Sequence, residues 1–109
     1  MNIEEYKEAA KIVRRTDVYD VYDLSSLERL NLSLTELNGF QKTGGHYHDA
    51  EEVYIFIEGN GKIQIGENFT ECKAGDVFLI PSDNFHRVWN EGSDVLKFWS
   101  IFEKYGDRR

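Results

Sequence analysis

The stretch that decides the fold is HYHDAEE, residues 46–52. In an extended strand, residues i and i+2 project from the same face, so His46 and His48 can reach one point in space. Glu52 follows four residues beyond His48, and a slight bend of the chain returns its carboxylate to that face. Further along, His86 begins another predicted strand. Three imidazoles and one carboxylate are a common set of ligands for a divalent transition metal ion.

Apolar residues at alternate positions predict an all-β domain around this stretch. Strands are predicted over residues 30–35, 53–57, 62–65, 77–80, 85–90 and 95–102. The segment Glu58-Gly59-Asn60-Gly61 predicts a tight turn, because Asn-Gly tolerates positive φ at both central positions. Several short strands at turn spacings near ten residues indicate a sandwich or a barrel.

The N-terminal segment predicts a short helix over residues 3–15, because Ile3, Tyr6 and Val13 recur at helical spacing. We expect this helix to pack on the outside of the barrel or on a partner subunit, and a lid over the barrel mouth is the alternative. The predicted organisation is one domain over residues 1–109, with the helix at 1–16 and the barrel at 27–104.

The spacings around the candidate ligands resemble the two sequence motifs of the cupin superfamily. The matching residues are His46, His48, Glu52 and Gly59 in the first motif, and Gly75, Pro81, His86 and Asn90 in the second. The resemblance spans residues 44–90, and its short spacer between the two motifs is typical of small cupins. It implies a double-stranded β-helix, or jelly-roll, barrel of the RmlC-like type, with the metal ion held by strand-borne ligands at an open mouth.

Two positions depart from the cupin pattern. Phe40 stands where the pattern has a glycine before the first histidine, and we expect Gly39, Gly44 or Gly45 to supply that turn. Asp83 stands where the pattern has a glycine after the proline, and Asp tolerates left-handed backbone better than most residues. Neither position is a candidate ligand.

Strand parity suggests the walls of a substrate pocket. Tyr54 and Phe56 share the parity of Glu52, and Asn90 shares that of His86, so these three are the pocket candidates. Trp89 and Tyr47 have the opposite parity to the ligands and should face away from the metal. Further polar candidates, each favoured as a solvated surface residue, are Asn31, Ser33, Gln41, Lys42 and Lys97. Only Lys42 and Arg87 are basic and close to the motifs, which argues against a strongly anionic substrate.

Composition narrows the possible partners. The formal net charge is −7, so nucleic acid and anionic membrane surfaces are disfavoured. No apolar run is long enough to cross a membrane. The single cysteine, Cys72, excludes an internal disulfide, fits a cytoplasmic protein and is interpreted as a buried, inert thiol. Predicted strands that are apolar on both faces favour a homodimer.

Three functions are compatible with this pattern. The first is a metal-dependent enzyme that acts on a small polar metabolite, with isomerase-like or dioxygenase-like chemistry and with Glu52 or a metal-bound hydroxide moving protons. The metal would be iron, manganese, nickel, cobalt or zinc. The alternatives are a non-catalytic cupin that binds a sugar or other small metabolite, and a barrel that the metal only stabilises. Retention of all four ligands favours the enzyme.

Overall fold

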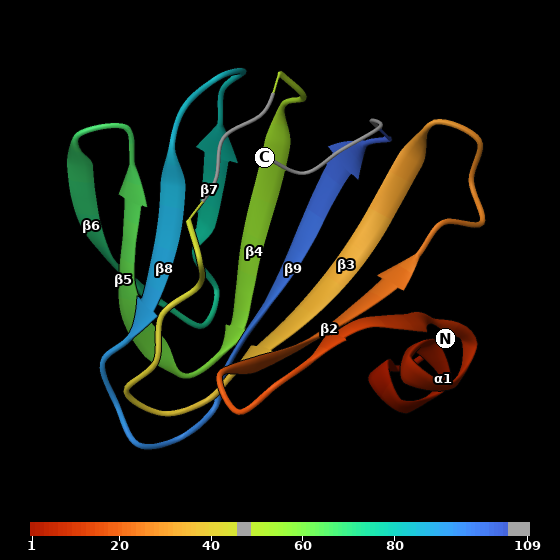
Figure 1. The fold of residues 1–109 in the computed structure, drawn as a ribbon, viewed down its shortest axis with the longest axis horizontal. Helices are drawn as coiled ribbons and strands as arrows, with labels where there is room; N and C mark the ends of the chain where they lie inside the picture. Colours follow the sequence, from red (N-terminus) through yellow and green to blue (C-terminus); the bar gives the residue numbers. More distant parts are fainter. Residues whose placement is uncertain (46–48, 105–109) are drawn as a thin grey trace.

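Two antiparallel sheets make up the computed structural model, which describes residues 1–45 and 49–104 (Figure 1). The first sheet has the strand order β1-β2-β3-β9-β4-β7 and the second the order β6-β5-β8. The prediction of a mostly β fold with a short N-terminal helix is confirmed. In chain order the elements are α1 (Ile3–Ala9), β1 (Lys11–Arg15), β2 (Tyr19–Leu24), β3 (Leu30–Leu37), β4 (Glu52–Glu58), β5 (Asn60–Ile65), β6 (Asn68–Lys73), β7 (Val77–Ile80), β8 (His86–Asn90) and β9 (Leu96–Glu103).

The core lies between the two sheets, where every second residue of the central strands is buried. On β4 the buried side chains alternate with partly exposed ones, as expected for a strand with one face towards the barrel interior. Phe56 of β4 and Phe98 of β9 pack with ring centroids 5.1 Å apart. Ile63 and Val88 of the smaller sheet belong to the same cluster. This packing fills the end of the barrel where β4 finishes, and leaves space at the end where it begins.

Cys72 of β6 is buried in this core and forms no disulfide. Burial raises the pKa of its thiol to about 12, and the nearby carboxylates of Asp76 and Glu71 add to the shift. A protonated thiol is a poor nucleophile. This environment agrees with the interpretation of Cys72 as an inert residue.

The predicted N-terminal helix is too long. The helix α1 begins with a capping box between Asn2 and Glu5 and ends at Ala9, and residues 11–15 then form a strand against β2. β-branched Ile12 and Val13 favour strand, and pairing with β2 satisfies backbone groups that an isolated final helical turn would leave to water. The strands over residues 11–15 and 19–24 therefore belong to the larger sheet, although the barrel was predicted to begin at residue 27.

Tyr6 fixes α1 to the outer face of the larger sheet. Its hydroxyl lies 2.7 Å from the carbonyl oxygens of both Tyr22 and Leu32. Its ring meets Trp99 edge to face, with centroids 4.8 Å apart. Burial, with the charge of Asp23, raises the pKa of this phenol well above its usual value. The helix thus covers part of the sheet's outer face and does not lie over the barrel mouth (Figure 1).

Left-handed backbone occurs at both positions that depart from the cupin pattern. Asp83 has φ +58°, which confirms that it can stand in for glycine there. Phe40 has φ +59°, so Phe40 itself adopts the left-handed conformation that neighbouring glycines were expected to supply, and of those glycines Gly45 is left-handed too, with φ +74°. A left-handed residue with a side chain costs roughly 1–2 kcal/mol. Phe40 is 73% exposed, so little packing offsets that cost.

Candidate metal centre and pocket

The two sheets bring Glu52 and His86 together inside the barrel. Glu52 is the first residue of β4 and His86 the first residue of β8. His86 Nε2 lies 3.4 Å from Glu52 Oε1, with the two side chains only 1% and 5% exposed. These residues are 34 positions apart in the sequence and lie on different sheets. The barrel therefore juxtaposes the two predicted metal ligands that fall within the described residues.

The His86 imidazole is oriented by the turn that precedes β8. Its Nδ1 lies 3.0 Å from the carbonyl oxygen of Asn84. A carbonyl can only accept, so Nδ1 carries a proton and donates it, and Nε2 faces the Glu52 carboxylate. An imidazole nitrogen and a carboxylate that face each other in a buried site are joined by a proton or by a cation that both groups bind. A metal-ligating histidine has this arrangement, in which the distal nitrogen donates to a backbone carbonyl.

Glu52 is held in place by the neighbouring strand β9. The Ser100 hydroxyl donates a hydrogen bond to Glu52 Oε2, which leaves Oε1 on the side of His86. Tyr54, two residues along β4, meets the His86 ring edge to face with centroids 5.7 Å apart. Both donor groups are therefore preorganised by packing and hydrogen bonds, as a metal site requires.

His46 and His48 lie outside the described residues, as does Tyr47. Gly44 and Gly45, immediately before them, line the same pocket as Glu52. Within residues 1–45 and 49–104, no group of three or more His, Cys, Asp or Glu side chains forms a site that could hold a metal ion. The described part of the predicted site is therefore the pair Glu52 and His86, and its chemistry suits a divalent cation.

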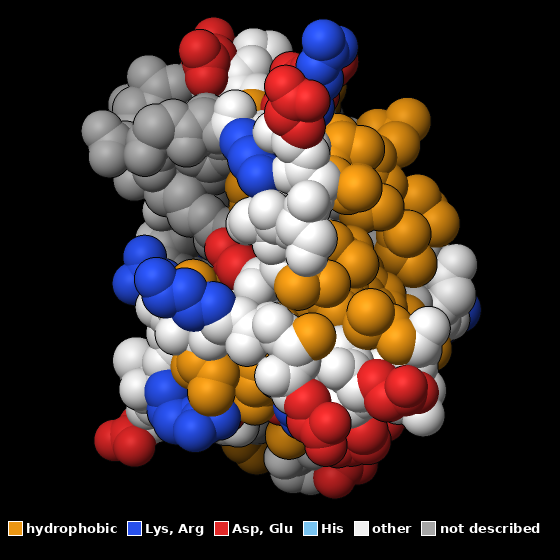
Figure 2. Space-filling model, turned by 90° about the vertical axis from the view of Figure 1, so that its right-hand side faces the viewer, with side chains coloured by type: hydrophobic (Ala, Val, Ile, Leu, Met, Phe, Trp, Pro, Cys, Tyr) orange, Lys and Arg blue, Asp and Glu red, His pale blue; other side chains and the backbone are white. Residues whose placement is uncertain are grey.

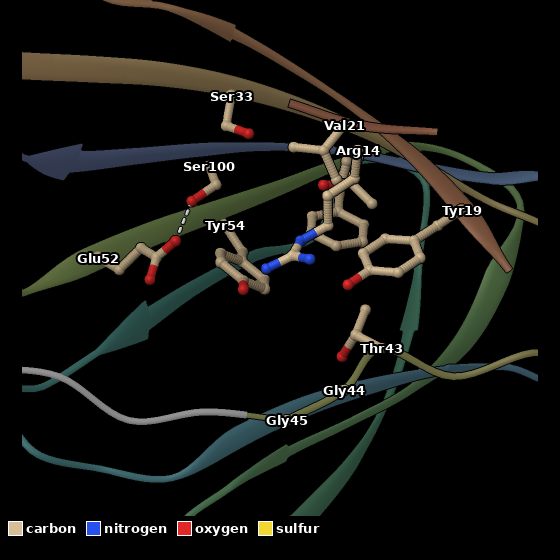
Figure 3. A pocket seen from close by; sticks show the side chains of 12 residues that line it. Arg14, Tyr19, Val21, Ser33, Thr43, Gly44, Gly45, Glu52, Tyr54 and Ser100 are labelled. Atoms are coloured by element: carbon tan, nitrogen blue, oxygen red, sulfur yellow. Dashed lines mark hydrogen bonds between the residues drawn. The ribbon is translucent and has the colours of Figure 1, made fainter. Parts of the chain in front are cut away.

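A pocket of about 170 Å³ opens next to Glu52 at the unfilled end of the barrel (Figure 3). Its volume is below the roughly 300 Å³ at the lower end of sites for drug-sized molecules, so it suits a small metabolite. The strands β1, β2, β3, β4 and β9 and the segment before residue 46 supply its walls. The lining residues are Arg14, Tyr19, Val21, Ser33, Thr35, Thr43, Gly44, Gly45, Glu52, Tyr54, Phe98 and Ser100.

Of the three predicted pocket residues, Tyr54 lines this pocket and the other two do not. Phe56 lies one pleat deeper on β4 and packs in the core. Asn90 lies at the far end of β8, where its amide donates to the carbonyl oxygens of Leu37 and Asp94. Parity correctly gave the face of each residue but not its depth, because the core fills the barrel beyond Tyr54.

The other polar candidates are dispersed. Ser33 is buried and lines the pocket, contrary to its interpretation as a surface residue. Asn31 is also buried, one pleat away on β3, and accepts a hydrogen bond from Ser25. Lys97 forms surface ion pairs with Glu36 and Glu58. Gln41, Lys42 and Trp89 line a separate shallow hollow outside the smaller sheet.

Sequence reasoning named Glu52, Tyr54 and Ser33 and missed the other lining residues of the pocket, among them Arg14, Tyr19 and Thr43. Arg14 was assigned to the helix, and the strand β2 that carries Tyr19 was not predicted. The signal that could have located both was the run of β-branched and aromatic residues over positions 12–22. Arg87, the basic residue closest to the motifs, donates instead to the carbonyl oxygens of Thr43 and Gly44 at the pocket wall.

The sequence over residues 34–102 matches the profile of the cupin domain. The chain belongs to the cupin family. The match covers well over half of the 109 residues and includes both strands that carry Glu52 and His86. The predicted membership of the cupin superfamily is thereby confirmed.

Curated relatives of this cupin include two dioxygenases. Over 56 residues the chain is 34% identical to gentisate 1,2-dioxygenase of Haloferax, a match that covers 51% of this chain and 16% of the relative. Over 93 residues it is 26% identical to acireductone dioxygenase of Leishmania major, covering 79% of this chain and 27% of the relative. The cupin thus spans only a fraction of the length of these relatives.

Among solved structures, the cupin resembles a predicted oxalate decarboxylase of Thermotoga maritima. The TM-score is 0.78 at 20% identity, over 91% of this chain and 96% of that one. At this identity the likeness establishes the fold alone. In the described residues, no helix of this cupin is long and apolar enough to span a membrane.

Proposed function

We propose that this cupin binds one divalent transition metal ion through His46, His48, Glu52 and His86, and uses it to catalyse a reaction of a small polar metabolite. The observation that carries the proposal is the pair of facing donors, His86 Nε2 and Glu52 Oε1, 3.4 Å apart in a buried site. The dioxygenases among its relatives favour dioxygenase-like chemistry, and isomerase-like chemistry is the second possibility.

Each described residue has a defined part in this proposal. The metal ion would polarise a substrate oxygen or bind dioxygen. Glu52 would bind the metal through the carboxylate oxygen nearer His86, and its carboxylate is the group that would move a proton to or from the substrate. Ser100 would hold the carboxylate in this orientation through its hydrogen bond to the other oxygen. Tyr54 and Phe98 would limit access of water to the reacting groups from one wall of the pocket.

A non-catalytic cupin that binds a sugar or another small metabolite is the alternative. A purely structural metal ion is the third candidate, and the apolar core between the sheets argues against it, since Phe56, Phe98, Ile63 and Val88 pack there without any metal ligand. The volume of the pocket beside Glu52 favours a function that involves a small molecule.

Elemental analysis of the full chain, purified without added metal, tests the proposal. We expect close to one transition metal ion per chain, removable by a chelator and restored by iron or manganese. Metal-loaded protein is then assayed for oxygen uptake with gentisate and for carbon dioxide release with oxalate. No bound metal, even after reconstitution, would overturn the metal site. Metal binding without turnover of either compound favours the binding protein over the enzyme.

We also propose that the cupin forms a homodimer through the outer face of its larger sheet. Figure 2 shows hydrophobic side chains gathered in a broad area. Two adjoining apolar hollows lie on this face and share Leu30 and Ile101. Leu79 of the edge strand β7 is 70% exposed there. The second hollow is lined by apolar and uncharged polar residues. An apolar surface of this kind matches a second copy of itself, because a twofold axis sets the same patch against its own image.

Leu79→Asp is expected to convert a dimer into a monomer, because it would bury unpaired carboxylates in the interface. Light scattering coupled to size-exclusion chromatography should give twice the 12.7 kDa chain mass for the wild type and the single mass for the variant. Phe69→Asp, an exposed apolar position on β6 of the smaller sheet, is the matched control and should stay dimeric. A monomeric wild type, or a dimeric Leu79→Asp, would refute this interface.

A further inference from the structure

Arg14 lies on the wall of the pocket because β1 carries a bulge. Ile12 pairs with Tyr22 and Arg14 pairs with Val21, so Val13 is an extra residue between them. Residues opposite each other in an antiparallel pair share a face, and Val21 lines the pocket. In a regular pairing, Val13 would oppose Val21 and Arg14 would face outward. Bulges that redirect a side chain are frequent beside active sites.

The Arg14 guanidinium extends into the pocket between Tyr54 and Tyr19 (Figure 3). Within the described residues, no hydrogen bond or ion pair engages it. Arg15, the next residue, differs in this respect, since it pairs with Asp20 and with the Tyr22 hydroxyl. The pocket therefore contains a permanently charged guanidinium whose N–H groups have no protein acceptor among the described residues.

The pocket has two chemically different ends. Glu52 and Ser100 lie at one end, beside His86, where donor atoms suit a metal ion. Arg14 and Thr43 lie towards the other end (Figure 3). Thr43 Oγ1 already accepts the Val88 N–H, so its hydroxyl proton is available to donate to a ligand. One end thus offers donors to an anion, and the other offers a carboxylate and an imidazole to a cation.

We propose that Arg14 binds a carboxylate of the substrate, so that the cupin acts on a small organic acid whose other oxygens point towards Glu52 and His86. The binding of a carboxylate by Arg14 rests on the pocket alone. The orientation of the other oxygens towards Glu52 and His86 rests on the proposed function. A planar guanidinium matches a planar carboxylate through two parallel hydrogen bonds. A small organic acid has a carboxylate that Arg14 can bind and other oxygens that can face the end of the pocket at Glu52 and His86.

A carboxylate fits this environment better than a phosphate. One guanidinium balances one negative charge, whereas a phosphate near pH 7 brings more than one. Glu52 in the same pocket and the net charge of −7 would repel the excess. The small volume, about 170 Å³, also favours the flatter and smaller group.

Titration of the full chain with benzoate and with benzamide, its neutral analogue of the same shape, tests the role of Arg14. Binding is followed by NMR on the protein as purified and after chelation, because in the chelated sample no metal can bind the carboxylate. We expect benzoate to bind at least about tenfold more tightly than benzamide, and Arg14→Gln to abolish this preference. Arg14→Lys should keep part of the preference for benzoate, since Lys retains the positive charge but lacks the planar guanidinium. Arg15→Gln, with its partners outside the pocket, is the matched control.

Equal binding of the two probes by the wild type, or an unchanged preference in Arg14→Gln, would overturn the assignment. Tighter binding of inorganic phosphate than of benzoate at the same residue would replace the carboxylate with a phosphate. The metal content of each sample separates the two proposals. If the protein binds no metal but still prefers benzoate to benzamide, the result counts against the proposed function alone. If it binds metal but shows no preference for benzoate, the result counts against the role of Arg14 alone.

Discussion

Glu52→Gln is expected to lower the affinity for metal at least about 100-fold while the barrel stays folded. Glutamine has the shape of glutamate and can still accept the hydrogen bond from Ser100. It lacks the negative charge that faces His86 Nε2, so a divalent cation between the two groups loses its anionic ligand. Elemental analysis and a competition titration with a chromogenic chelator measure the loss.

Ser33→Ala is the control for this variant, because Ser33 lines the same pocket and is not a predicted ligand. It should bind metal as the wild type does. Circular dichroism and melting temperature establish that both variants are folded. A folded Glu52→Gln that retains a stoichiometric metal ion with wild-type affinity would show that Glu52 is not a ligand.

Gly61→Ala is expected to destabilise the protein by about 3 kcal/mol, a fall of about 15 °C in melting temperature. Gly61 lies on the central strand β5, between Cys72 of β6 and Asn90 of β8. A Cβ added there would overlap the carbonyl oxygen of Trp89 and lie 3.1 Å from Leu96 Cδ2. The first of these is backbone within a sheet, so it cannot move without breaking strand pairing.

Gly92→Ala is the matched control for the same substitution. A Cβ at Gly92 would meet nothing closer than 3.8 Å, and its backbone is not left-handed. We expect its free energy of unfolding to stay within about 0.5 kcal/mol of the wild type. Denaturant unfolding of both variants measures the difference. Equal stability of the two would mean that β5 and β8 can separate at Gly61 without cost.

The sequence was sufficient for the central fold because its strands repeat every two residues and its ligand spacings are specific. It also indicated that Glu52 and His86 meet, although they lie on different sheets. The local sequence pattern gave wrong predictions at positions where pairing with a neighbouring strand decides the backbone conformation. Asn60 and Gly61 were expected to form a tight turn, but both belong to β5, and positive φ occurs at Gly59 instead.

The N-terminal part of the pocket could not be predicted for a related reason. Residues 11–15 fit a helix by their apolar spacing, and only the edge of an existing sheet makes them a strand. The bulge at Val13 follows from register against β2, which no property of the residues themselves reveals. The run of β-branched and aromatic residues could therefore mark positions 12–22 as strand, but nothing in the sequence shows that Arg14 faces the pocket, whereas the histidines have a specific spacing.

The placement of Arg14 on an edge strand also separates two kinds of evolutionary change. Every residue of β1 is exposed, and the strand pairs along one side only. Substitutions or one-residue insertions there can alter which molecules the barrel accepts with little effect on the packed interior. Glu52 and His86, in contrast, are buried among β4, β8 and β9, where most changes would disturb folding. Duplicated copies of such a gene could diverge in substrate through this one strand while they keep a common reaction centre.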